Sequence, residues 1–155
     1  MREKFIVTND TELARITKNR SQAYNELRTL ENNANKDDFK LACFYYYIGM
    51  TFKNEYEITK NIGAIQQACS NYSKAIEKNP SDPTYFINRA ETLIALKQWD
   101  AAQKDLDKAK SFHCNKPFFE VSNTFMILQL GKIIKENTLH AAIKDEKVSS
   151  SRLAP

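Results

Sequence analysis

The chain repeats its own pattern of small and large apolar residues with a period of 34. A small residue, a large one and a second small one are spaced four and three apart, first in residues 68–75 and again in residues 102–109. These residues are Ala68, Tyr72, Ala75, Ala102, Leu106 and Ala109. Spacings of three and four put side chains on one face of a helix. A fixed period of this length is typical of stacked helical units, so the repeat predicts an array of helix pairs.

The helix that precedes residues 102–109 repeats as well. Tyr85, Ala90 and Trp99 are followed 34 residues later by Phe119, Thr124 and Ile133. Farther upstream, Gly49 and Phe52 have the spacing of Ala90 and Leu93 but stand 41 residues before them. This longer offset predicts a seven-residue insertion between two helices, near residues 53–63. Periodicity, capping residues and breakers together predict about seven helices, at 12–32, 37–53, 64–78, 82–97, 99–112, 116–134 and 138–147.

Composition restricts the fold class to all-α. The 155 residues include only three glycines and four prolines, too few for the turns of a sandwich or barrel. With 42% apolar and 27% charged residues, the chain has the composition of one globular domain. The apolar run before Thr8 is too short for a signal peptide, and no segment reaches the roughly 20 apolar residues that cross a bilayer.

The repeated residues resemble the tetratricopeptide repeat (TPR) family, whose units are helix-turn-helix pairs of 34 residues. The resemblance is strongest from Ala68 to Ala109 and implies a right-handed α-α superhelix. It also implies that the small residues Ala90, Ala102 and Ala109 lie where helices approach closely. Pro80 would end a second helix, and Trp99 would pack on the core.

The same resemblance divides the chain into units. Residues 1–36 form an N-terminal capping helix or a degenerate half-repeat. Residues 37–81 form a unit with the insertion, and 82–115 form a regular unit. Residues 116–147 would form a degenerate unit or a C-terminal capping pair. Residues 148–155 have no apolar period and are expected to form a disordered tail.

In the TPR family, partner peptides bind in the concave groove that the first helix of each unit lines. The positions carried over are Cys43, Tyr46, Tyr47, Met50, Asn54, Asn88, Glu91, Ile94, Phe118, Ser122, Phe125 and Gln129. An alternative for several of them, especially Phe118 and Phe125, is packing beneath an end helix. Tyrosine and methionine offer a large, adaptable contact area. The expected function is therefore a non-enzymatic adaptor, similar to a co-chaperone, that binds a partner peptide.

Two subfamilies of TPR proteins can be compared through these positions. Binders of acidic chaperone tails hold a carboxylate with lysine, asparagine and arginine. Asn88 matches their central asparagine, but Tyr46, Met50, Phe118 and Ser122 stand at the other clamp positions, so the cations are missing. Bacterial secretion chaperones use three repeats in a chain of similar length, but the +4 charge and the insertion do not match them.

No catalytic residues, metal ligands or cofactors are predicted. The two histidines, His113 and His140, have no partner at zinc spacing, and the single glycines form no phosphate loop. Cys43, Cys69 and Cys114 are odd in number and lie near apolar stretches, which is typical of free thiols in a reducing cytoplasm. Asp105 and Asp107 lie on a lysine-rich helix and are expected on a solvated face.

The expected partner is a protein or peptide, with neither nucleic acid nor membrane. The 23 basic residues are mixed with 19 acidic ones and form no stripe of the kind that neutralises phosphates. Two alternatives stay open. The chain could be a secretion-type chaperone or a bacterial effector domain, or it could be a self-associating structural subunit. In the last case a homodimer would bury Phe44, Tyr45 and the end helices.

Overall fold

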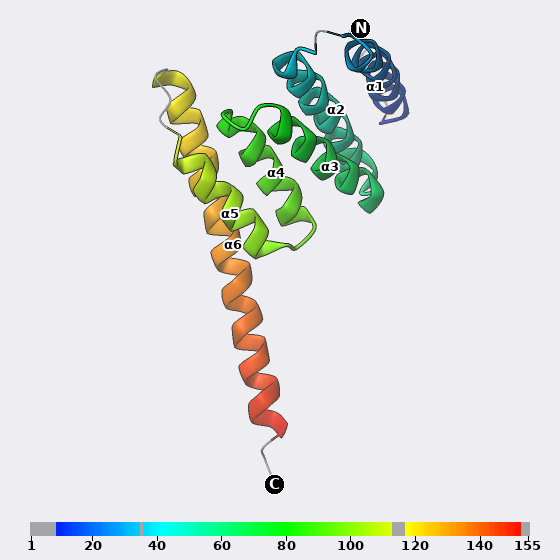
Figure 1. The fold of residues 1–155 in the computed structure, drawn as a ribbon. Coiled ribbons are helices and arrows are strands. Elements are labelled where there is room, and N and C mark those ends of the chain that lie inside the picture. Colours follow the sequence, from blue (N-terminus) through cyan, green and yellow to red (C-terminus); the bar gives the residue numbers. More distant parts are fainter. Residues whose placement is uncertain (1–8, 35, 113–116, 153–155) are drawn as a thin grey trace, which may run out of the picture.

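The computed structural model describes residues 9–34, 36–112 and 117–152, and within the last helix it describes the side chains of 122–144. These residues form six α-helices and no strand, which confirms the all-α prediction (Figure 1). The helices are α1 (Asn9–Glu31), α2 (Asp38–Thr59), α3 (Ile62–Lys78), α4 (Pro83–Ala95), α5 (Trp99–Lys110) and α6 (Pro117–Arg152).

Short polar side chains start the three central helices. Asp37 accepts a hydrogen bond from the backbone N–H of Lys40, and Asn61 and Asp82 do the same for backbone N–H groups two residues on. These are N-cap hydrogen bonds, which satisfy donors that a helix leaves unpaired. Pro83 follows its cap at the first helical position, where the absence of an N–H costs nothing.

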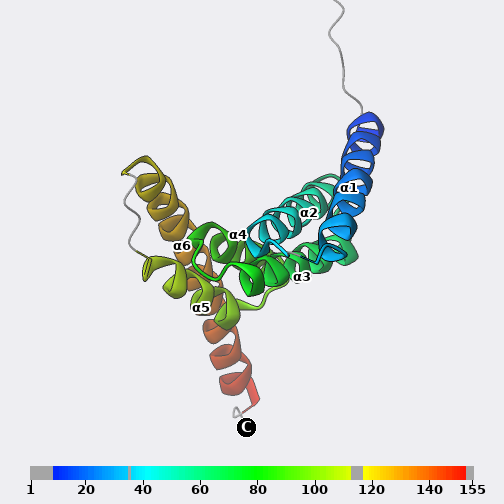
Figure 2. The same cartoon turned by 45° about the horizontal axis from the view of Figure 1, so that its top comes forward.

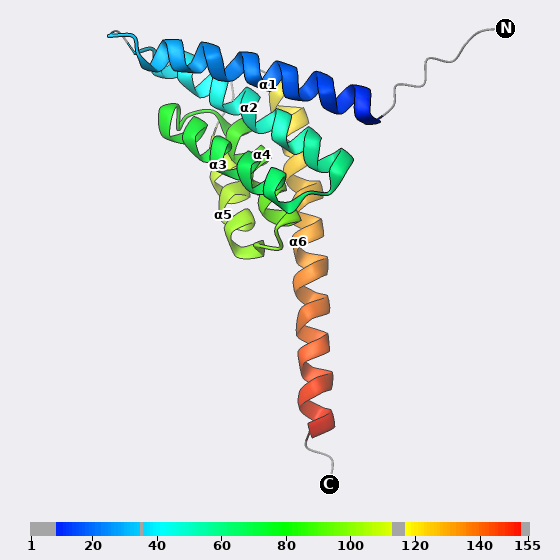
Figure 3. The same ribbon diagram turned by 90° about the vertical axis from the view of Figure 1, so that its right-hand side faces the viewer.

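Each helix packs mainly against its neighbours along the chain, from α1 on α2 through to α5 on α6, and α4 also contacts α6. Figures 2 and 3 show α2 to α5 as a stack of antiparallel hairpins, with α1 covering α2. The three small residues expected at close approaches, Ala90, Ala102 and Ala109, are buried, as are Ala68 and Ala75 of the same repeat. Ala109 is 3% exposed, and the other four are fully buried.

The core has two main parts. One is formed by α4, α5 and α6 and includes Ile87, Leu106 and Ile134, with Trp99 packed against it. The other is formed chiefly by α1 and α2 and includes Leu27, Leu41 and Ile48. Ile76 of α3 contacts both parts. The hydrophobic core therefore runs along the array from one helix pair to the next. Within the described ranges, every helix is too short or too polar to serve as a membrane span.

The predicted insertion lengthens a helix instead of forming a loop. Helix α2 runs to Thr59, six residues beyond the predicted end, and stops where Lys60 adopts a left-handed conformation with φ of 55°. Left-handed residues commonly end helices, but glycine usually fills that position. The lysine was therefore no signal for the boundary.

The prediction of two C-terminal helices is wrong. Residues 117–152 form one helix, without the break expected at 134–138, so the described chain has six helices rather than seven. The polar side chains at the expected break bond within the helix. The amide of Asn137 donates to the Ile133 carbonyl, and the Thr138 hydroxyl donates to that of Ile134. The helix continues to Arg152, into the segment predicted as a tail.

Candidate functional site

Two of the predicted groove residues, Tyr46 and Asn88, meet where α2 lies beside α4. The Tyr46 ring lies between the rings of Tyr72 on α3 and Tyr85 on α4, with centroids 5.7 and 5.1 Å away. The Tyr46 hydroxyl accepts a hydrogen bond of 3.3 Å from the Asn88 amide, which also donates to the Thr84 carbonyl at 2.9 Å. Both amide protons of Asn88 are thus used, and its orientation is fixed.

An ion pair extends this junction toward the end of α2. Lys53 Nζ lies 2.7 Å from Oε2 of Glu91, a third predicted groove residue, and both side chains are partly shielded from solvent. Met50 stands between Tyr46 and Lys53 on α2 and is 36% exposed. We call the surface formed by Tyr46, Met50, Lys53, Asn88 and Glu91 the α2–α4 face. It combines one exposed apolar side chain with polar groups that are held in place.

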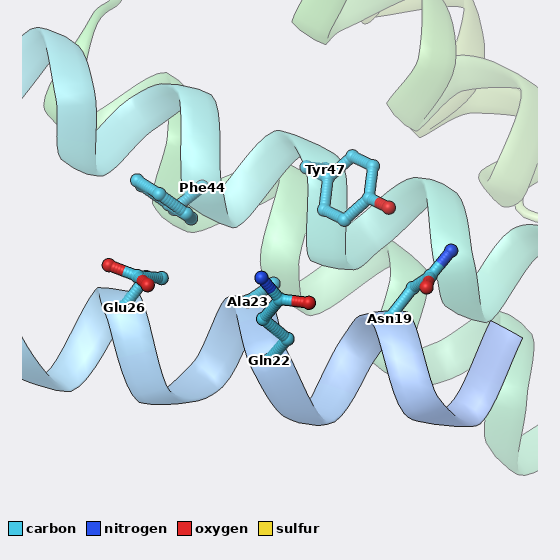
Figure 4. A pocket seen from close by; sticks show the side chains of 6 residues that line it. All are labelled: Asn19, Gln22, Ala23, Glu26, Phe44 and Tyr47. Carbon is cyan, nitrogen blue, oxygen red and sulfur yellow. The ribbon is translucent and has the colours of Figure 1, made fainter. Parts of the chain in front are cut away.

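A pocket of about 340 Å³ lies between α1 and α2 (Figure 4). Tyr47 and Phe44 project into it from α2, opposite the polar side chains of α1. The lining residues are Asn19, Gln22, Ala23, Glu26, Phe44 and Tyr47. Tyr47 is 41% exposed and faces this pocket, so the structure separates it from its neighbour Tyr46.

An ion pair and a cation-π contact also join α1 to α2. Arg20 of α1 lies 2.6 Å from a carboxylate oxygen of Glu55, and its guanidinium carbon is 3.9 Å from the centre of the Phe52 ring. Both charged side chains are largely buried. The N-terminal helix is therefore held on α2 by an ion pair with cation-π support.

The remaining predicted groove residues do not converge on one cleft. Ser122, Phe125 and Gln129 are exposed on α6, and Cys43 is an exposed free thiol on α2. Asn54 is partly buried on α2, whereas Ile94 packs against the core of α4, α5 and α6. The side chain of Phe118, like Cys114 and His113, lies outside the described part of the chain.

Sequence reasoning missed two contributors to these surfaces. Lys53 was assigned to the end of a helix, yet it pairs with Glu91 across the junction. Asn19, Gln22 and Glu26 have spacings of three and four along α1, and they line the pocket beside the apolar face of that helix. This second, polar stripe was the available signal for the pocket.

A second hollow, of about 350 Å³, lies where α3, α4 and α5 meet, and it corrects a prediction. Asp105, expected on a solvated face, lines this hollow with only 8% of its side chain exposed. The Arg89 guanidinium donates two hydrogen bonds of 2.7 Å to its carboxylate and a third, of 3.1 Å, to the Ser73 hydroxyl. The hydrogen bonds from Arg89 to Asp105 raise the pKa of Arg89 above its ordinary value. Asp107 is exposed, as expected.

Burial raises the pKa of four tyrosines at the junctions of α2. It is the largest cause for Tyr45, Tyr46, Tyr72 and Tyr85, and the pKa of Tyr45 rises to about 12 with the help of its hydrogen bond to Glu31. The Tyr72 hydroxyl is buried and has no hydrogen-bond partner in the part of the chain that the structure describes. An ionised tyrosine is therefore disfavoured at each of these sites.

We expect the protein to lose stability as the pH rises above about 10, the ordinary pKa of tyrosine. In the unfolded chain these four tyrosines ionise near that pH, while in the folded chain they keep their protons to higher pH. The stabilisation is thus complete below about pH 10 and declines above it. Urea unfolding at a series of pH values would measure the decline. Tyr72→Phe should make it shallower, and an identical decline in that variant would contradict the assignment to these tyrosines.

The described residues contain no group of three or more histidine, cysteine, aspartate or glutamate side chains placed to hold a metal ion. No family model matches the chain, and neither the curated proteins nor the solved structures give a match.

Proposed function

We propose that the chain is a non-enzymatic, TPR-like interaction module that binds a segment of a partner protein on the α2–α4 face. The proposal includes the right-handed superhelix that the repeat implies, in which α2 and α4 are first helices of successive units. The observation that carries it is the state of Asn88. Its two amide protons are used within the protein, while its Oδ1 accepts no hydrogen bond from the described residues.

An extended peptide can supply a hydrogen-bond donor and an apolar side chain to this face. A hydrophobic side chain can cover the exposed part of Met50, and a backbone N–H that reaches the 9% of Asn88 open to solvent can donate to its Oδ1. The Lys53–Glu91 pair, partly open to water, offers charged groups at the edge of the same surface. Fixed polar groups around an apolar anchor favour binding because little side-chain entropy is lost.

The test uses variants that leave the core intact. Tyr46→Ala is unsuitable, because the Tyr46 ring packs between Tyr72 and Tyr85. Met50→Glu places a charge on an exposed position and should fold normally. Peptides are first selected from a displayed random library on the wild-type protein, and their affinities are then compared by fluorescence anisotropy. We expect Met50→Glu to weaken binding about tenfold or more, the loss of roughly 1.4 kcal/mol.

The matched control is Ile62→Glu, since Ile62 is also an exposed apolar residue but lies at the start of α3. It should bind the selected peptides like the wild type. Asn88→Ala should weaken binding as well, by removing the acceptor. Because Asn88 is buried and bonds to Tyr46 and Thr84, the thermal unfolding of this variant is measured beside that of the wild type to separate lost binding from lost stability. If Met50→Glu and Asn88→Ala both retain wild-type affinity, the α2–α4 face is not the binding surface.

A further inference from the structure

Helix α6 has two apolar faces, of which only one is covered. Ile127, Leu130 and Ile134 are buried against α4 and α5. A second set of apolar side chains is open to solvent, with Phe125 60%, Leu128 66%, Leu139 62% and Ile143 43% exposed. With 3.6 residues per turn, these four fall within about 60° of one another, on the opposite side of the helix from the buried three. We call them the α6 stripe.

The second half of the stripe lies where the helix has left the rest of the protein. Every residue from 135 to 144 is exposed, and Figures 1 and 3 show this part of α6 projecting beyond the other helices. An isolated helix in water is only marginally stable. The stripe has an apolar pair at each end, Phe125 with Leu128 and Leu139 with Ile143, and exposed apolar side chains grouped in this way are typical of an interaction surface. We therefore expect a partner to cover the stripe, which extends over about 27 Å of helix from Phe125 to Ile143.

The order of residues along the stripe is complementary to a second copy of the stripe that runs antiparallel to it. Phe125 and Ile143 lie equally far from residue 134, and Leu128 and Leu139 do so to within one residue. Between them, Lys132 and Glu136 also lie symmetrically about residue 134. Two antiparallel α6 helices would thus bring apolar side chains opposite apolar ones and each Lys132 opposite Glu136 of the other copy. A two-fold interface requires this kind of self-complementary surface.

The charges also select the direction of pairing. In a parallel pair, Lys132 would face Lys132 and Glu136 would face Glu136, which is repulsive. Within one chain, Lys132 and Glu136 form a loose ion pair, with 3.8 Å between Nζ and Oε1 and both side chains well exposed. Because an exposed pair of this kind contributes little free energy, breaking it to form ion pairs with a second copy loses little stability.

We propose that the chain forms a homodimer in which the α6 stripes of two copies pair antiparallel, centred near residue 134. This interface is separate from Met50 and Asn88, so it does not rest on the proposed function. Sedimentation equilibrium should give twice the chain mass of 17.9 kDa at high concentration. Leu128→Glu and Leu139→Glu should each raise the dissociation constant by about tenfold or more, because a charge would be buried among apolar side chains.

The control is Lys144→Glu, which changes charge on the same exposed helix but points about 120° away from the stripe. It should dimerise like the wild type, and circular dichroism should show equal helix content in all variants. A wild-type chain that stays monomeric at every concentration overturns the proposal and leaves the stripe to another partner. A dimer that survives both leucine substitutions overturns it too, since the copies would then meet elsewhere.

A charge exchange tests the antiparallel arrangement directly. Lys132→Glu alone places two carboxylates together at each contact between the copies, and Glu136→Lys alone places two ammonium groups together. Each variant should therefore dimerise more weakly than the wild type. Mixing the two variants should restore a dimer, because each chain then presents the charges that the other lacks. Single variants that dimerise like the wild type, or a mixture that stays weak, would refute this pairing.

Discussion

Gly49→Ala is expected to lower the free energy of unfolding by about 1–3 kcal/mol, although alanine is the better helix former. A Cβ atom at residue 49 would lie 2.7 Å from Cε1 and 2.8 Å from Cδ1 of Tyr72. The Tyr72 ring is completely buried between α2 and α3 and contacts Tyr46, so it cannot swing aside. The two helices would have to separate. Urea unfolding of wild type and variant would measure the change.

Gly131→Ala is the matched control, since it is also a glycine inside a helix. A Cβ at this position meets no atom within 4 Å among the described residues. The substitution should therefore stabilise the protein by about 0.5–1 kcal/mol through helix propensity alone. Opposite signs at the two glycines are the expected result. A stabilising Gly49→Ala would mean that α2 and α3 do not approach as closely as described.

Asp105→Ala is expected to lower the free energy of unfolding by about 3 kcal/mol. Removing one partner of a buried ion pair destabilises proteins by about this much, because the other charge is left buried and unpaired. Asp105 receives two 2.7 Å hydrogen bonds from Arg89, and the variant would leave that guanidinium without its carboxylate beside the core of α4 and α5. The Ser73 hydroxyl would be its one remaining hydrogen-bond partner among the described residues. Thermal unfolding, compared with the wild type at equal pH, would measure the loss.

Asp107→Ala provides the comparison, two residues farther along α5. Asp107 pairs with Lys110 at 3.4 Å on an exposed surface. Such pairs contribute about 0–1 kcal/mol, so this variant should unfold almost like the wild type. Equal effects at the two aspartates would contradict the buried pairing of Arg89 with Asp105.

Local features of the structure were readable from the sequence. The resemblance placed Ala90, Ala102 and Ala109 between packed helices, and all three are buried. Helix ends with a side-chain cap, such as Asp82 before Pro83, were also predicted closely. Each of these features is encoded within a few residues.

Other features depend on partners distant in sequence and could not be predicted. Asp105 is buried because Arg89 lies sixteen residues earlier on another helix. Asn137 and Thr138 bond to their own helix, although the same residue types also end helices. In the candidate site, the sequence pointed to Tyr46 and Asn88 separately. Their hydrogen bond and the pairing of Lys53 with Glu91 required the arrangement of α2 beside α4.

The contacts between successive helices determine the order in which the protein unfolds as well as its folded arrangement. Because nearly all packing joins neighbours in the chain, no helix from one end closes the array against the other in the described part of the structure. Proteins built from such local contacts fold fast and do not need to lose every unit at once. We therefore expect the two ends to unfold while the centre persists. The projecting half of α6 should exchange its amide protons with solvent first, and α2, α3 and α4 should protect theirs longest.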